Sequence, residues 1–311
     1  MRLVLYTYVA MFTAPIYAQI PGMNFDKMEL ASFNYGLVPD LGTTQIENYT
    51  VGLGFGIPMK KGVIGSSIRY DYYHFRFNER VNPFDISDFE KMHSIGLSAF
   101  YLHPLSSTCN LMISAGPALM SNFQNGITSD DLILSGRAVA IKRWGGQEKN
   151  AALMFGAAYG ILFGAPNVFP IISFRKKVND RWSYSLGLPQ TGATYRINER
   201  NQVSILISPD SYFGNNSSEV SLDNFETLST TKLQYLSVRT GLEHRYQLQP
   251  NITIVTKAGL VPFGDLEVRD VNNNVLYEFE TDSSPYISTG LSFNINRNSN
   301  DKKNKNETNE D

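Results

Sequence analysis

Apolar residues alternate with small or polar residues in one segment after another of this chain. In residues 49–57 the odd positions hold Tyr, Val, Leu, Phe and Ile, whereas the even positions hold only Thr and Gly. Residues 93–101 and 287–295 repeat this pattern. Because successive side chains of a strand point to opposite faces, each segment is predicted to be a β-strand with one apolar and one polar face. No comparable stretch has helical periodicity.

About 14 segments show this alternation, and most have the roughly 9 to 11 residues that cross a bilayer when tilted. The predicted strands are 27–36, 46–57, 63–77, 91–102, 108–121, 131–143, 150–163, 168–178, 181–188, 192–198, 201–212, 232–248, 251–263 and 284–295.

The connections between these segments alternate in length. Short turns are predicted at 58–62, 103–106, 178–180, 198–200 and 249–251, and longer loops at 37–45, 78–90, 213–231 and 264–283. Short turns at one end and long loops at the other are typical of outer-membrane barrels. We therefore predict an all-β fold, a closed antiparallel transmembrane β-barrel of about 14 strands in the cell outer membrane. The alternative is 12 strands, if the short hairpin at 181–198 does not span the membrane.

The two ends of the chain differ from this body. Residues 1–18 carry an early Arg2 and a short apolar run that ends at the small residue Ala18, which predicts a signal peptide. The barrel is then expected to occupy 19–295, and the polar residues 296–311 to form a disordered tail. With a net charge of -2 nothing points to nucleic acid as a partner, and the single Cys109 excludes an intrachain disulfide.

Two blocks of sequence carry a resemblance to a known family. The first runs from Ala115-Gly116-Pro117 to residue 141, and the second from Gly164-Ala165-Pro166 to Pro189. They resemble a family of outer-membrane β-barrel proteins that is classed as a domain of unknown function and is common in Bacteroidota. The resemblance covers roughly residues 28–295 and implies the fold and the membrane, but no activity. One departure concerns the barrel-insertion machinery, which reads a terminal aromatic residue in many barrels, because here Phe293 is followed by Asn294, Ile295 and the polar tail.

The four histidines and the acidic residues form no catalytic or metal-binding pattern in the sequence. His93-Ser94 and Glu243-His244 are neighbours in sequence, but adjacent side chains of a strand point to opposite faces and do not form a dyad. The sequence has no phosphate-binding loop and no metal-ligand spacing. We therefore expect no enzymatic activity, no cofactor and no metal.

Charged residues fall on the face of the strands opposite to the apolar one. They are Arg69, Asp71, Arg137, Arg175, Arg196, Arg239, Glu243 and Lys257. A charge in contact with lipid at the bilayer centre costs about 2 to 4 kcal/mol, so these side chains are expected in the lumen. Two interpretations remain open: a structural network in which arginines pair with Asp71 and Glu243, or a polar channel that favours anions.

Aromatic residues crowd the outer ends of two predicted strands. They are Tyr72, Tyr73, Phe75 and Phe77 on one strand and Tyr212 and Phe213 on another. Aromatic girdles at the membrane interfaces account for such clusters, and we expect these side chains to contact lipid headgroups.

The sequence leaves the function open between two classes. One hypothesis is a small pore or channel for polar solutes, and the other is a structural or surface-interaction barrel with a filled lumen; a membrane-embedded enzyme is a weaker third. Outer-membrane lipid and the barrel-insertion machinery are the expected partners, and the substrate is unknown.

Overall fold

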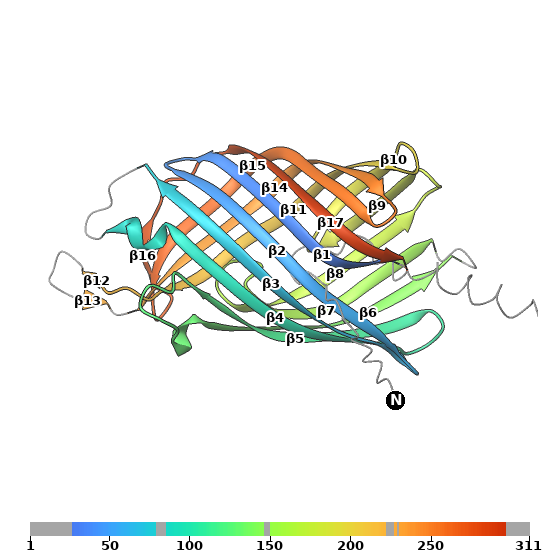
Figure 1. Cartoon of the computed structure of the whole chain (residues 1–311), viewed down its shortest axis with the longest axis horizontal. Coiled ribbons are helices and arrows are strands. Elements are labelled where there is room, and N and C mark those ends of the chain that lie inside the picture. The colour runs from blue at the N-terminus through green and yellow to red at the C-terminus, as the bar shows by residue number, and fades with distance from the viewer. Residues whose placement is uncertain (1–26, 79–84, 146–149, 222–226, 229, 297–311) are drawn as a thin grey trace, which may run out of the picture.

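The chain forms a closed antiparallel β-barrel (Figure 1). This computed structural model describes residues 27–78, 85–145, 150–221, 227–228 and 230–296. The predicted signal peptide and nearly all of the predicted polar tail lie outside these residues. Among them no helix is long and apolar enough to cross a membrane.

Fourteen strands make up the wall of the barrel, as the sequence predicted. They are β1 (Lys27–Leu41), β2 (Thr44–Met59), β3 (Gly62–Phe77), β4 (Lys91–Pro104), β5 (Cys109–Ser121), β6 (Leu132–Trp144), β7 (Ala151–Gly160), β8 (Asn167–Lys177), β9 (Trp182–Leu188), β10 (Thr191–Arg196), β11 (Asn201–Asn216), β14 (Thr231–Gln249), β15 (Ile252–Asp270) and β17 (Ser284–Asn296). Each strand pairs with the next, and β17 pairs with β1 to close the ring.

The alternation of the sequence separates an apolar outer surface from the interior. On β2, Val51 and Leu53 are 42% and 44% exposed, whereas Gly52 and Gly54, which alternate with them, are buried. On β3, Ile68 and Tyr70 lie on the exposed face, and Ser67 and Asp71 lie on the buried one. An exposed apolar belt around a polar interior is what a barrel in contact with lipid requires.

The two ends of the barrel differ. One end carries the short turns, such as the one that joins β2 to β3 at residues 60–61. The other end, called the outer end below, carries the 3₁₀ helix η1 (Ile86–Phe89), the hairpin of β12 (Val220–Ser221) and β13 (Thr227–Leu228), and the short strand β16 (Val275–Glu278), seen at the left of Figure 1.

Three of the predicted long loops are shorter than predicted, because the strands continue into them. The predicted loop at 37–45 is a tight turn at Gly42 and Thr43, in which Gly42 has a φ of +64°. The strand β11 runs to Asn216 into the predicted loop 213–231, and β15 runs to Asp270 into the predicted loop 264–283. The physical reason is burial, since the outer parts of these strands carry apolar side chains that pack inside the barrel, as described below.

The hairpin of β9 and β10 is the shortest part of the wall. These strands have 7 and 6 residues, and both pair with their neighbours, so the alternative of 12 strands is wrong. Pairing of β8 with β9 begins at Ile172, and pairing of β10 with β11 ends at Ile207. In the described residues, the outer parts of β8 and β11 therefore do not pair with β9 and β10, and the outer end of β11 instead pairs in parallel with β5 at Asn215 and Ser121. We call this break in the wall the notch.

Candidate functional site in the barrel interior

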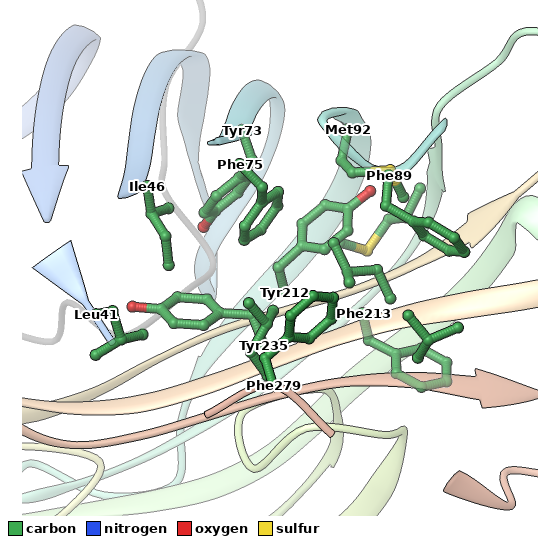
Figure 2. Packing of buried hydrophobic residues seen from close by; sticks show 14 of the residues in the cluster. Leu41, Ile46, Tyr73, Phe75, Phe89, Met92, Tyr212, Phe213, Tyr235 and Phe279 are labelled. Carbon is green, nitrogen blue, oxygen red and sulfur yellow. The ribbon is translucent and has the colours of Figure 1, made fainter. Parts of the chain in front are cut away.

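The outer half of the interior is filled by apolar side chains, which we call the plug (Figure 2). Its largest fully buried members are Leu41, Ile46, Phe75, Phe89, Met92, Tyr212, Leu233, Tyr235 and Leu266. They come from β1 to β4, from β11, β14 and β15, and from η1. Burial of this much apolar surface stabilises the outer end in the way that a core stabilises a globular protein.

Aromatic rings of the plug meet across the barrel. The ring centroid of Tyr73 on β3 lies 4.9 Å from that of Tyr212 on β11, and Phe75 lies 6.1 Å from Tyr235 on β14. The hydroxyl of Tyr212 donates a hydrogen bond of 3.0 Å to the carbonyl oxygen of His93 on β4. Such ring pairs contribute about 0.5 to 1.5 kcal/mol beyond the area that they bury. The plug thus ties distant parts of the wall together.

The predicted aromatic girdle is wrong for four of its members. Tyr73, Phe75, Tyr212 and Phe213 are at most 5% exposed and belong to the plug. Tyr73 and Phe75 have the same parity on β3 as Asp71, so they point inward with it. Phe77 packs against the plug as well. Aromatic residues do cluster on the outside, where the ring centroid of Tyr72 lies 6.0 Å from that of Tyr49 and 5.1 Å from that of His93.

Polar side chains at the outer end form hydrogen bonds beside the plug. Asn122 donates to the side-chain oxygen of Asn216 over 2.6 Å, and Asn215 donates to the carboxylate of Asp131 over 2.7 Å. Asn215 also pairs in parallel with Ser121 of β5. These bonds and the pairing with β5 join β11 to a part of the wall that is not its neighbour in the order of the ring.

Below the plug lies a belt of charged side chains. Asp71, 4% exposed, accepts hydrogen bonds from the guanidinium of Arg69 over 2.7 and 2.8 Å and from the hydroxyl of Thr50 over 2.7 Å. Arg69 and Asp71 are two residues apart on β3 and therefore share a face. A carboxylate buried in this way needs a cation and further donors to offset its desolvation.

A second ion pair joins Arg239 on β14 to Asp210 on β11, with 2.5 Å between a guanidinium nitrogen and a carboxylate oxygen. The guanidinium also lies 5.6 Å from the ring centroid of Tyr286. Asp210 is absent from the lumen residues that the sequence predicted, although it lies in the predicted strand 201–212. Asp210 lies an even number of residues from the buried Ser204 on β11, and this spacing indicates that its side chain points inward.

The third group centres on Glu243, which is 4% exposed. Its carboxylate accepts from Arg245 over 2.6 Å and lies 3.3 Å from the ammonium of Lys257 on β15. Arg245 was also not among the predicted lumen residues, although it lies an even number of residues from Glu243 and Arg239 and so shares their face of the strand. Each of the three carboxylates in the belt therefore faces at least one cation.

Three predicted residues form no ion pair within the described chain. Arg137 donates to the hydroxyl of Ser114 over 3.0 Å, Arg175 is partly buried on β8, and Arg196 is exposed at the end of β10. Of the eight predicted lumen residues, five therefore form ion pairs in the described part of the chain and three do not.

Two cavities lie beside the segment that joins β7 to β8, and Ile161 and Leu162 line both. One holds about 420 Å³ of empty space and is bordered by Asp71, Asp210 and Tyr212. The other holds about 610 Å³ and is bordered by Arg137.

The histidines do not assemble a catalytic centre from the described residues. His93 bonds to the hydroxyl of Tyr70, His103 to that of Tyr101, and His244 to Asn201, so none of these bonds reaches a serine, a cysteine or a carboxylate. Within the same part of the chain, no group of three or more His, Cys, Asp or Glu side chains is arranged to hold a metal ion.

Comparison with protein families gives one match. Residues 42–294 match the family described as "Domain of unknown function (DUF6268)". No curated protein sequence matches the chain.

Several solved barrels resemble the chain at low similarity. The NanC porin has 10% identity and a TM-score of 0.37, with 85% of this chain and all of the porin covered. The KdgM porin in complex with disordered oligogalacturonate has 7% identity, a TM-score of 0.34 and coverages of 85% and 99%. LpxR from Salmonella typhimurium has 8% identity, a TM-score of 0.35 and the same coverages. These values are too low to carry any argument about what this chain does.

Proposed function

Because the chain belongs to the DUF6268 family, whose description assigns no activity, we propose a function from its own interior: it is an outer-membrane barrel with a closed outer mouth. Its role is that of a structural or surface-interaction barrel with a filled lumen. Outer-membrane lipid surrounds it, and its outer end faces the outside of the cell. The observation that carries the proposal is the plug.

The plug supports a closed state because its contacts run between opposite sides of the wall. An ion that passed from end to end would have to separate Tyr212 from His93 and Tyr73 from Tyr212. Each separation opens buried apolar surface to water, at a cost of about 25 cal/mol per Å². A hydrated ion gains nothing in the plug that offsets this cost.

The charged belt supports the same proposal. A channel that favours anions needs cations that face an open path. Arg69, Arg239 and Lys257 instead face carboxylates at 2.5 to 3.3 Å. The belt is therefore close to neutral, and its ion pairs stabilise the fold below the plug.

Conductance across a planar bilayer tests the proposal. The purified barrel, shown to be folded by its heat-modifiable gel mobility, is expected to give no steady conductance steps. The Tyr73→Ala/Tyr212→Ala variant, with both rings of one plug contact removed, is expected to give frequent openings, and Tyr212→Phe is expected to stay closed. Steady channels in the unmodified protein would overturn the closed barrel and return the pore hypothesis.

A further inference from the structure

Arg137 is a cation of the interior that forms no ion pair within the described residues. Its Nε donates to Ser114, but among the described residues its two terminal nitrogens meet neither a hydrogen-bond acceptor nor a carboxylate. The side chain is partly buried on β6, and the next inward-facing residue of that strand, Val139, is fully buried. An unpaired charge in such a place is costly unless an anion accompanies it.

Arg137 borders the cavity of about 610 Å³. Most of its lining is apolar and includes Ala158, Leu162, Phe169 and Ile171. Ser114, Ser135 and Tyr159 contribute the other hydroxyl groups of the lining residues. A site with one cation against an otherwise apolar wall matches a ligand with one anionic group and an apolar body.

The cavity adjoins the notch in the wall. Pro189, in the turn between the short strands β9 and β10, lines it together with Phe169 and Ile171 from the part of β8 that β9 does not cover. Prolines occur on both uncovered edges, Pro170 on β8 and Pro209 on β11, where no strand partner requires an N–H group. The notch is thus a built feature of the wall, and it brings the cavity to the side of the barrel that faces lipid.

We propose that this cavity binds a single-chain amphiphile with an anionic headgroup, held by Arg137 at its head and by the apolar lining along its chain. The guanidinium forms two parallel hydrogen bonds with a carboxylate or a phosphate, the geometry that its unoccupied nitrogens offer. The notch gives a chain from the surrounding membrane a lateral way into the cavity. The site goes beyond the closed-barrel function, since ligand binding requires no path through the plug.

Binding of radiolabelled laurate to the full-length barrel in zwitterionic lipid nanodiscs tests the proposal, with empty nanodiscs as the blank. Saturable binding is expected. Unlabelled dodecyl phosphate is expected to compete, whereas acetate, dodecanol and dodecyltrimethylammonium are not. Whichever of unlabelled laurate and dodecyl phosphate competes more strongly identifies the source of the ligand: a free fatty carboxylate or a membrane lipid with a phosphate headgroup. Equal competition by acetate would show that no chain is held, and equal competition by dodecanol that no head is held; either result overturns the proposal.

Matched variants separate the site from the rest of the interior. Arg137→Gln is expected to weaken laurate binding by at least about ten-fold, because a charge-assisted bond is lost. Arg137→Lys is expected to restore part of the affinity, and Arg175→Gln, a partly buried arginine outside the cavity lining, to leave it unchanged. Equal affinities of Arg137→Gln and Arg175→Gln would overturn the assignment.

A second variant keeps the test decisive if Arg137→Gln does not fold. Ala158 lies opposite Arg137 in the β6–β7 register, and Ala158→Phe fills the cavity while it keeps the charge. Loss of laurate binding in this variant supports the site, and full binding overturns it. Because binding and conductance are measured separately, an open channel that binds laurate would refute only the closed barrel, and a closed barrel without binding only this site.

Discussion

The hydroxyl of Tyr212 on β11 donates a hydrogen bond to the carbonyl oxygen of His93 on β4 over 3.0 Å. In the ring of 14 strands, β4 and β11 are seven strands apart in either direction. The bond therefore joins the two most distant strands of the wall through the middle of the barrel. An open lumen would have no such contact across its middle. Because of this bond, the stability of the barrel depends on side chains inside it.

Removal of the Tyr212 ring is expected to destabilise the barrel strongly. Tyr212→Ala deletes a fully buried aromatic ring and should lower the free energy of unfolding by about 3 to 5 kcal/mol. Tyr212→Phe keeps the ring, loses only the bond to His93 and should cost about 1 kcal/mol. Equilibrium unfolding in guanidinium, with the protein in lipid vesicles, gives both values. Equal stability of the three proteins would contradict a packed plug.

The ion pair of Arg239 and Asp210 is expected to be coupled. Arg239→Met leaves a partly buried carboxylate without its cation and should cost about 3 kcal/mol of unfolding free energy. Asp210→Asn in the same chain removes that charge, so the double variant should be more stable than Arg239→Met alone. A double-mutant cycle from guanidinium unfolding measures the coupling. Strict additivity of the two changes would show that the pair contributes no mutual stabilisation.

Alternation in the sequence sufficed to predict the barrel, because one period-two pattern decides both the strand and its two faces. The same rule, applied to Tyr73 and Phe75, would have placed them inside with Asp71. The cluster of aromatic residues near a strand end instead indicated a girdle. Alternation is the stronger signal because it follows from the geometry of the backbone, whereas the cluster is only a feature of composition.

The contacts that close the barrel could not be predicted from the sequence. Tyr212 and His93 are 119 residues apart, and nothing local marks them as partners. Their meeting depends on the approach of the outer part of β11 to β5 across the ring, which is a property of the whole wall. The Arg137 cavity is similar, since the sequence predicted an inward arginine but not that it would lack a carboxylate while Arg69 and Arg239 have one.

The tight turn at Gly42 is expected to tolerate no side chain. A Cβ at this position would collide with the backbone carbonyl of Glu280, and its φ of +64° disfavours residues other than glycine. Gly42→Ala should therefore lower the unfolding free energy by about 1 kcal/mol or more. Gly126→Ala is the matched control, because Gly126 also has a positive φ but has open space around it. A smaller loss at Gly42 than at Gly126 in guanidinium unfolding would contradict the contact.

Contact of Leu53 with lipid is expected to make this position sensitive to charge. Leu53 is 44% exposed on the apolar face of β2, between Ala31 and Ile68 in the register. If it lies near the bilayer centre, Leu53→Arg should cost about 2 to 4 kcal/mol in vesicles. Leu53→Ala removes the same side chain without adding a charge and serves as the control. Similar losses for both variants would mean that this face does not contact hydrocarbon.

Two exposed glutamates at opposite ends of the barrel allow its orientation in the membrane to be measured. Glu219 follows β11 at the outer end, and Glu199 lies in the short turn between β10 and β11. In a Cys109→Ser background, Glu219→Cys on intact cells should react with a membrane-impermeant maleimide, and Glu199→Cys should react only after the outer membrane is opened. This follows because short turns of outer-membrane barrels face the periplasm and longer loops face the outside. The reverse labelling pattern would invert the orientation and place the plug at the periplasmic end, where it could not close the outer mouth.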